Sequence, residues 1–295
     1  GIRKNLGLYI MFAIPFAWYL VFKYAPMYGI QIAFRRFNPT LGITGSPWTD
    51  LTYFKQFFES YYFTDILWNT VSLSVFTMLI GFPVPILLAL LINEIKNVRF
   101  KKLIQNITYI PNFLSVVVIV SMLTLFSNSD YGLFNKITGL FGAEPVDFMS
   151  KPALFQPLYV FSNVWQFMGF NAIIYIAALS GVDQELYEAA SIDGATRLQK
   201  IVHISIPCIM STIIVLFIMR IGSLMSVGFE KVYLMQNSVT LSASEVISTF
   251  IYKNGIQKGQ FSYSTAVGLF NSVINFVLLV SANFASKKLT KTSLW

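Results

Sequence analysis

The stretch GVDQELYEAASIDGATRLQKIVHISIP, residues 181–207, separates two long apolar runs and gives the most specific information in the sequence. Asp183 has the side chain that caps helix starts, and Gly194 tolerates the left-handed backbone at which many helices end. Thr196 and Gln199 have the spacing of a capping box, in which side chains and backbone amides bond reciprocally. The stretch therefore predicts two short helices, held near a membrane surface by the apolar runs on either side.

Apolar composition extends outward from this stretch along all 295 residues. Hydrophobic side chains make up 55% of the chain and charged ones 12%, whereas a soluble domain carries about 25% charged residues. This much apolar surface excludes both a water-soluble globular fold and a disordered chain. A spanning helix needs about 17 to 25 mostly apolar residues, and six runs reach that length. The runs are 6–22, 66–92, 104–126, 156–180, 206–227 and 263–285.

The six runs predict an all-α membrane protein with six transmembrane helices, in which residues 1–295 form a single transmembrane domain. We expect the first run to stay as a helix rather than to be removed as a signal peptide, because no small-residue cleavage site follows it. Prolines inside the runs leave backbone carbonyl groups without their helical partner, and Asn and Gln side chains there also need hydrogen-bond partners. Both features favour a packed bundle in which neighbouring helices supply those partners.

The basic residues predict the orientation of the chain. Its net charge of +8 is not evidence of a nucleic-acid partner, because the Lys and Arg side chains flank the apolar runs. The connection 93–103 carries four of them and is therefore expected in the cytoplasm. With six spans, the connection 181–205 and both termini then lie in the cytoplasm of a multi-pass protein of the cell membrane. The terminal residues that support this orientation are Arg3, Lys4, Lys287, Lys288 and Lys291.

The inner connection resembles the EAA loop of ABC-importer permeases. The resemblance rests on Glu188-Ala189-Ala190, Asp193-Gly194-Ala195, Ile204 and Pro207. Two positions depart from the usual pattern, namely Ile201 where an aromatic residue is common and Ile206 where Leu is common. The resemblance implies the type I importer permease fold, with this loop as the coupling helix that docks into a cleft of an ATP-hydrolysing partner. It implies this role for Glu185, Leu186, Glu188, Ala189, Ala190, Asp193, Gly194, Ala195 and Arg197.

Two further stretches resemble permeases of the oligosaccharide branch of carbohydrate importers. They are KYAPMYGIQIAF at 23–34 and SEVISTFIYKNGIQKGQFSYSTAVGLFNSV at 244–273. The resemblance implies that the chain forms half of the translocation path for an oligosaccharide. The implied partners are a second permease subunit, related or identical, an extracellular substrate-binding protein, and two ATPase subunits that bind ATP and Mg. This chain has no P-loop, so we expect it to bind no cofactor and not to be an enzyme.

Polar side chains within the spans are the candidates for the substrate path, since such residues face other helices or a water-filled path. Arg220 lies 13 residues beyond Pro207, which places it about 20 Å into the membrane. It either lines the path, bonding sugar hydroxyls or a uronate carboxylate, or forms a structural pair with a backbone carbonyl or with another subunit. Glu230 and Lys231 more often mark the outer membrane interface than a site. The path candidates are Asn163, Trp165, Gln166, Asn171, Arg220, Asn271 and Asn275.

Three other functions are weighed against an oligosaccharide importer. A secondary transporter needs intramembrane carboxylates or an internal repeat, and the spans show neither. A membrane enzyme or a metal site needs clustered ligands, whereas His203 is the single histidine of the chain. Import of another solute, such as an amino acid or a peptide, stays open within the permease family.

Overall fold

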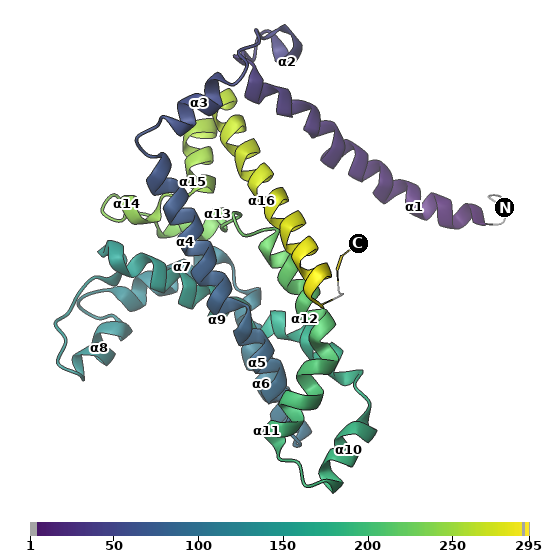
Figure 1. The fold of residues 1–295 in the computed structure, drawn as a ribbon. Helices are drawn as coiled ribbons and strands as arrows, with labels where there is room; N and C mark the ends of the chain where they lie inside the picture. Colours follow the sequence, from purple (N-terminus) through teal and green to yellow (C-terminus); the bar gives the residue numbers. More distant parts are fainter. Residues whose placement is uncertain (1–4, 291–292, 295) are drawn as a thin grey trace. The chain divides into compact units, whose positions relative to one another are not determined.

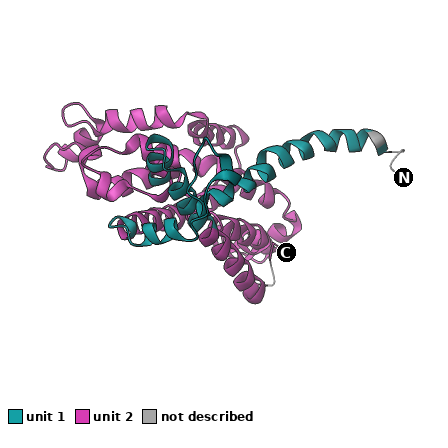
Figure 2. Ribbon diagram, turned by 90° about the horizontal axis from the view of Figure 1, so that it is seen from above, with its two compact units in different colours: residues 1–63, 250–272 teal, residues 64–249, 273–295 magenta. Residues whose placement is uncertain are grey.

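A computed structural model describes residues 5–290 and 293–294, which are almost entirely helical. The described residues contain no strand and only two isolated β-bridges, Arg35 with Trp48 and Asn38 with Gly42. The chain divides into two compact units, drawn in different colours in Figure 2. Unit 1 comprises residues 1–63 and 250–272, and unit 2 comprises residues 64–249 and 273–295. The sequence prediction was a single transmembrane domain, and the two units are described separately below.

Unit 1 begins with a long helical run whose geometry changes along its length. It is α-helical at first, then a π-helix, then a 3-10 helix, and in its most apolar window no residue is buried within the chain. An aromatic cluster holds the remainder together, with Phe57 in ring contact with Phe63, Phe250, Tyr263 and Phe270 at centroid distances of 5.1 to 6.4 Å. The elements are α1 (Leu6–Tyr19), η2 (Leu20–Tyr24), η3 (Ala25–Phe34), α2 (Gly42–Gly45), α3 (Thr52–Phe58), η7 (Lys253–Gln257), the second half of α15 (Ile247–Tyr252) and the start of α16 (Phe261–Thr290).

Unit 2 is organised around α9 (Pro152–Ser180), which runs through two hydrophobic clusters. One cluster joins α9 to α7 (Val116–Ser127) and α13 (Phe229–Met235), and the other joins it to α5 (Pro83–Asn93) and α12 (Ile206–Ile221). Figure 1 labels these helices. The other elements are α4 (Phe63–Gly81), α6 (Val98–Tyr109), η4 (Ile110–Phe113), α8 (Leu133–Gly139), η5 (Phe148–Ser150), α10 (Gln184–Ile192), α11 (Arg197–Lys200), η6 (Ile201–Ser205), α14 (Leu241–Ser244) and the end of α16.

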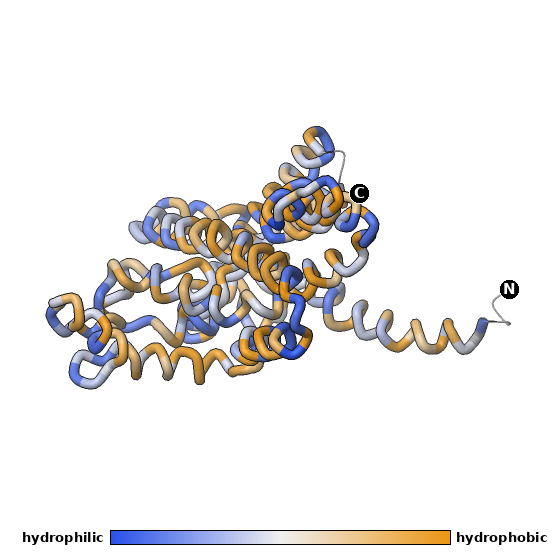
Figure 3. Tube along the Cα trace, turned by 90° about the horizontal axis from the view of Figure 1, so that it is seen from below, coloured by the Kyte–Doolittle hydropathy of each residue, from blue (hydrophilic) through white to orange (hydrophobic). Residues whose placement is uncertain are grey.

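In Figure 3, which is coloured by hydropathy, the long helices are largely hydrophobic, and hydrophilic residues are found mainly at their ends and in the connections. Within the described residues, five helical runs are long and apolar enough to cross a membrane, and a bent pair makes a sixth candidate. The continuous runs are Gly7–Phe34, Phe63–Asn93, Pro152–Ser180, Arg197–Ile221 and Phe261–Thr290. The all-α fold predicted from the sequence is confirmed.

The sequence predicts one transmembrane helix at 104–126, but the structure has two helices there that meet at a sharp bend. Val98–Phe113 and Val116–Ser127 meet at 99°. Pro111 lies in the 3-10 turn η4, Leu114 is extended, and the Ser115 side chain then caps α7 by accepting a hydrogen bond from the Val118 amide. A proline followed by a new helix cap ends one helix and starts another, which produces the bend.

Candidate functional site: the inner connection

The inner connection folds into the two short helices that its capping residues predict. The Asp183 carboxylate accepts a hydrogen bond from the Glu185 amide at 3.0 Å and starts α10. Gly194, with φ +78°, follows the helix end, and the Ala195 amide bonds back to the Ala190 carbonyl at 2.9 Å. This is the bonding pattern of a Schellman cap, which requires a left-handed residue.

The second short helix starts with the predicted capping box. The Thr196 amide donates to Gln199 Oε1 at 2.7 Å, and the Gln199 amide donates to Thr196 Oγ1 at 3.4 Å. This second helix, α11, continues without a break through the π-helix η6 into α12. Pro207 lies in the first turn of α12. The connection is therefore built directly onto the span Arg197–Ile221.

Two side-chain contacts tie α10 to this span. Tyr187 and Ser205 share a hydrogen bond of 2.9 Å between their hydroxyl groups, and the Tyr187 ring packs against the α5–α9–α12 cluster. Lys200 Nζ donates to Ser191 Oγ at 2.6 Å. Sequence reasoning missed Tyr187, although its place on the opposite side of α10 from Glu185 was a usable signal. These two contacts join α10 to the end of the span that begins at Arg197.

The opposite side of α10 is open. No residue of α10 is buried, and three apolar side chains of the connection are exposed, Leu186 at 47%, Ile192 at 87% and Leu198 at 70%. The predicted coupling residues Glu185, Leu186, Glu188, Ala189, Asp193, Gly194 and Arg197 are exposed, and Ala190 and Ala195 are partly buried. Exposed large apolar side chains of this kind fit the predicted role of the connection in binding a partner protein.

Candidate functional site: the pocket in unit 2

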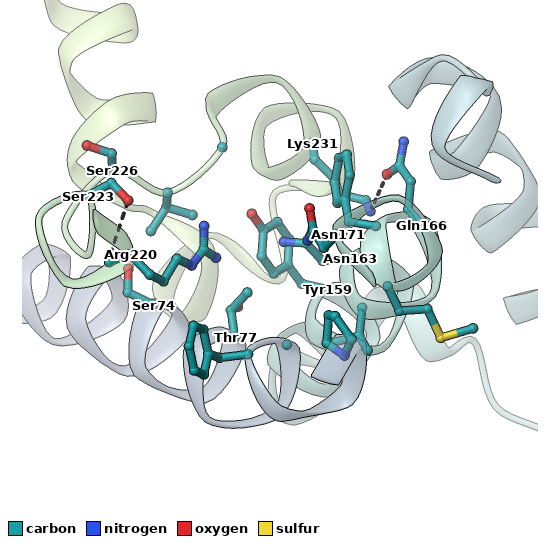
Figure 4. A pocket seen from close by; sticks show the side chains of 18 of the residues that line it. Ser74, Thr77, Tyr159, Asn163, Gln166, Asn171, Arg220, Ser223, Ser226 and Lys231 are labelled. Carbon is teal, nitrogen blue, oxygen red and sulfur yellow. Dashed lines mark hydrogen bonds between the residues drawn. The ribbon is translucent and has the colours of Figure 1, made fainter. Parts of the chain in front are cut away.

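A pocket of about 590 Å³ lies within unit 2, with walls from α4, α9, α12, α13 and the segment 222–228. Figure 4 shows its polar side chains. Four of the seven predicted path residues line it, namely Asn163, Gln166, Asn171 and Arg220. Aromatic rings and aliphatic side chains supply much of the remaining wall, including Tyr159 and Phe167. Apolar walls with a few placed polar groups are the ordinary composition of a small-molecule site.

Three predicted path residues do not line this pocket. Trp165 packs against the cluster of α7, α9 and α13. Asn275 holds the segment after α12, since its Oδ1 accepts from the Met225 amide at 2.9 Å and its Nδ2 donates to Ser226 Oγ at 3.1 Å. Asn271 belongs to unit 1, and its buried Oδ1 has no hydrogen-bond partner among the described residues. Their proposed contact with substrate stays a prediction.

Lys231 is buried in the pocket wall and does not lie at a solvated interface. Its side chain is 5% exposed, and Nζ donates to Gln166 Oε1 at 3.0 Å, the contact dashed in Figure 4. Nζ also lies 6.0 Å from the centroid of the Tyr159 ring. Burial lowers the pKa of Lys231 to about 8, because the charged form loses its hydration. The sequence did not single out this residue as a site, since its burial depends on packing between α13 and α9.

Arg220 reaches the same pocket from the last turn of α12. Within the described part of the chain, neither Arg220 nor Lys231 forms an ion pair, and Glu230 is the one carboxylate in the pocket lining. Pairing of Arg220 with another subunit stays a prediction. Among the described residues there is also no group of three or more His, Cys, Asp or Glu that could hold a metal ion.

Known proteins match this chain in both sequence and fold. The sequence pattern of the family described as "Binding-protein-dependent transport system inner membrane component" matches residues 81–291. Protein LplB of Bacillus subtilis (strain 168) is 42% identical over 295 residues, covering 100% of this chain and 93% of its own length. The polygalacturonan/rhamnogalacturonan transport system permease protein YteP of the same organism is 44% identical over 281 residues, covering 95% of this chain and 88% of its own.

Two solved structures match the fold over nearly its whole length. A chain of a bacterial ABC transporter involved in the import of the acidic polysaccharide alginate superposes with a TM-score of 0.90 and 38% identity, covering 98% of both chains. A chain of the bacterial alginate ABC transporter in complex with an alginate pentasaccharide-bound periplasmic protein gives a TM-score of 0.91 at 38% identity, covering 99% of this chain and 98% of that one.

Proposed function

Because this chain belongs to the family of binding-protein-dependent transport system inner membrane components, we propose that it is a permease subunit of an ATP-driven importer and forms half of the path for an oligosaccharide. The observation that carries the proposal is the match over nearly the full length to a chain of an alginate importer at 38% identity. The name of YteP, which refers to polygalacturonan and rhamnogalacturonan, supports an oligosaccharide over an amino acid or a peptide.

The proposed partners follow from the open surfaces of the chain. We assign α10 to a cleft of an ATPase subunit, because this capped helix has no buried residue and leaves Leu186, Ala189 and Ile192 exposed. Two such ATPase subunits would bind ATP and Mg, and this chain would bind neither. A second permease subunit, related or identical, would complete the path, and an extracellular binding protein would deliver the sugar.

We further propose that the chain is a multi-pass protein of the cell membrane with both termini in the cytoplasm. The connection 93–103 and the last turn of α16, which contains Lys287 and Lys288, supply the basic residues that support this orientation. Arg3, Lys4 and Lys291, on which the sequence argument also relied, lie outside the described residues.

The proposed mechanism transmits motion through rigid contacts. Closure of the ATPase dimer would move α10, and the Tyr187–Ser205 and Ser191–Lys200 contacts would carry that motion into the span that has Arg220 in its last turn. Arg220 lines the pocket, so movement of this span would change access to the substrate. Coupling over such a distance needs an element with two arrangements, and we assign this role to the continuous run Arg197–Ile221.

Affinity purification of this chain from its native membrane, followed by mass spectrometry, tests the proposed assembly. We expect a second permease subunit and an ATPase subunit at a 1:1 ratio of ATPase to permease chains. A variant in which Leu186 and Ile192 are both replaced by Asp should insert normally and lose the ATPase subunit. Recovery of the chain without any ATPase, or equal recovery with the variant, would contradict the proposal.

A further inference from the structure

The Lys231 ammonium has donors that the protein leaves unused. An ammonium has three N–H groups, and the described residues supply one hydrogen-bond acceptor, Gln166 Oε1 at 3.0 Å. The Tyr159 ring lies 6.0 Å from Nζ and adds a weak attraction. A charge that is 5% exposed and lacks a counter-ion is costly to bury, so it ordinarily marks a site where an anion binds.

Gln166 is fixed so that its oxygen faces Lys231. Its Nε2 donates at 3.3 Å to the carbonyl of Leu114, the extended residue at the break between η4 and α7. The Gln166 side chain is itself 2% exposed. Since the amide group points its nitrogen at Leu114, its oxygen is turned to Nζ and holds the ammonium in one place. Lys231 is therefore a buried side chain held in one position by hydrogen bonds, whereas a lysine on the protein surface is mobile.

The charge of the pocket is unbalanced. Arg220 and Lys231 both line it, Glu230 is the one carboxylate among the described lining residues, and it pairs with neither cation. A neutral sugar is held by amides, hydroxyls and aromatic faces, which this pocket supplies through Asn163, Asn171 and Tyr159. Two cations without carboxylate partners are not needed for that task and select a negatively charged ligand.

We propose that Lys231, positioned by Gln166 and assisted by Arg220, binds a carboxylate of the sugar during its passage, so that the substrate is an oligosaccharide containing uronic acid. The inference rests on the proposed function and adds the chemical class of the substrate and the residue that recognises it. Two donors of the ammonium remain for a carboxylate, which forms stronger hydrogen bonds than a neutral hydroxyl. Asn163 and Asn171 are placed to bond ring hydroxyls of the same sugar.

Uptake of matched sugars tests this assignment. The complete importer is expressed in a strain without other uptake routes and supplied with labelled trisaccharides of galacturonate, mannuronate or guluronate, and with the same sugars after reduction of each carboxylate to a hydroxymethyl group. We expect the wild type to take up at least one acidic sugar at ten times the rate of its reduced form. Lys231→Met should lower that uptake at least tenfold, and Lys231→Arg should restore it to within threefold.

Two further variants separate recognition from folding. Lys136→Met removes the charge of an exposed lysine on α8, outside the pocket, and should leave uptake unchanged. Gln166→Glu gives Lys231 a carboxylate partner inside the protein and should lower acidic uptake at least fivefold. Every variant should co-purify with its ATPase subunits as the wild type does, which reports an assembled importer, and Lys136→Met should also retain ATP hydrolysis stimulated by the binding protein.

The outcomes distinguish the two proposals. Acidic uptake by Lys231→Met at the wild-type rate, or a wild type that prefers the reduced sugars, would overturn the assignment of Lys231 and leave the importer function standing. If binding-protein-stimulated hydrolysis is normal and neither sugar class enters, the uronate proposal is wrong. If the wild type neither hydrolyses ATP in response to the binding protein nor takes up any sugar, the proposed function fails and this inference fails with it.

Discussion

Two successive hydrogen bonds position Lys231 in the pocket: Lys231 bonds to Gln166, and Gln166 bonds to Leu114 at the break between η4 and α7. Because Ser115 starts a new helix, the extended residue Leu114 has a carbonyl outside the regular pattern, and that carbonyl accepts from Gln166. Gln166 in turn accepts from Lys231. The bend between η4 and α7 therefore positions a side chain on α13, more than 100 residues later in the chain.

The charge of Lys231 predicts how uptake depends on pH. Burial lowers its pKa to about 8, so the ammonium loses its proton and its charge as the pH rises through that value. We expect uptake of an acidic trisaccharide to fall between pH 7 and pH 9 in the wild type, relative to Lys231→Arg, whose guanidinium stays charged. The measurement is the ratio of the two initial rates at each pH.

The comparison with Lys231→Arg isolates this one group. The other titratable or charged side chains that line the pocket, Tyr159, Tyr175, Arg220 and Glu230, are present in both proteins. The partner subunits are also unchanged, so their pH dependence cancels in the ratio. A ratio that stays constant from pH 7 to pH 9 would show that the charge of Lys231 has no part in uptake.

Among the elements, α10 is held to its span by the Tyr187–Ser205 hydrogen bond. Tyr187→Phe removes the hydroxyl and leaves Ser205, which is buried, with one partner fewer. We expect more ATP hydrolysed per sugar imported, because motion of α10 is transmitted less completely to α12. A hydrogen bond of this kind contributes about 0.5–1.5 kcal/mol, so a change of two- to tenfold in the ratio is expected.

The double variant and a matched control test whether this bond is responsible. Ser205→Ala should have the same effect as Tyr187→Phe, and the two together should be no worse than either, since residues in contact do not act additively. Tyr61→Phe removes a hydroxyl from a side chain that is 87% exposed and should change nothing. Additive losses in the double variant would contradict a shared contact.

The packing of α6 against α9 depends on Gly169. A Cβ atom there would meet the backbone carbonyl of Thr108, which cannot move aside as a flexible side chain can. We expect Gly169→Ala to lower the free energy of unfolding by about 1–3 kcal/mol, the usual range for overpacking, and to lower the thermal unfolding midpoint of the purified importer. Gly268→Ala, whose Cβ would make an ordinary contact with Ile251, is the control. Equal midpoints for the two variants would show that α6 and α9 can separate freely.

Sequence reasoning located elements with local signals and missed those set by distant contacts. The two short helices of the inner connection follow from caps within a few residues of each helix, so Asp183, Gly194 and Thr196 were sufficient to predict them. The break at Leu114 lies in the run 104–126, which carries no charged residue, so hydropathy alone reads it as one span; Pro111 and Ser115 were the local signals that a helix ends and another starts there. Lys231 was assigned to the outer membrane interface because α13 is short and the partners that bury this lysine, Gln166 and Tyr159, lie on the distant helix α9.

At the scale of the whole molecule, the proposed topology makes a direct prediction about access from outside the cell. After Cys208, the single cysteine, is replaced by Ser, Lys102→Cys in the 93–103 connection should resist a membrane-impermeant thiol reagent in intact cells. Lys136→Cys on α8 should react, because the 127–155 connection lies outside in the same topology. Both positions are exposed in the structure, so a difference in labelling reports the membrane. Labelling of position 102 in intact cells would reverse the orientation.

The central claim is that this chain moves sugar only as part of an ATP-driven assembly, and uptake by proteoliposomes measures this directly. The purified importer is reconstituted with ATP enclosed, and the binding protein and a labelled uronic acid trisaccharide are added outside. We predict uptake that requires both ATP and the binding protein and that stops when the ATPase subunits are omitted. Uptake that proceeds without ATP, driven by an ion gradient across the same membrane, would contradict the account.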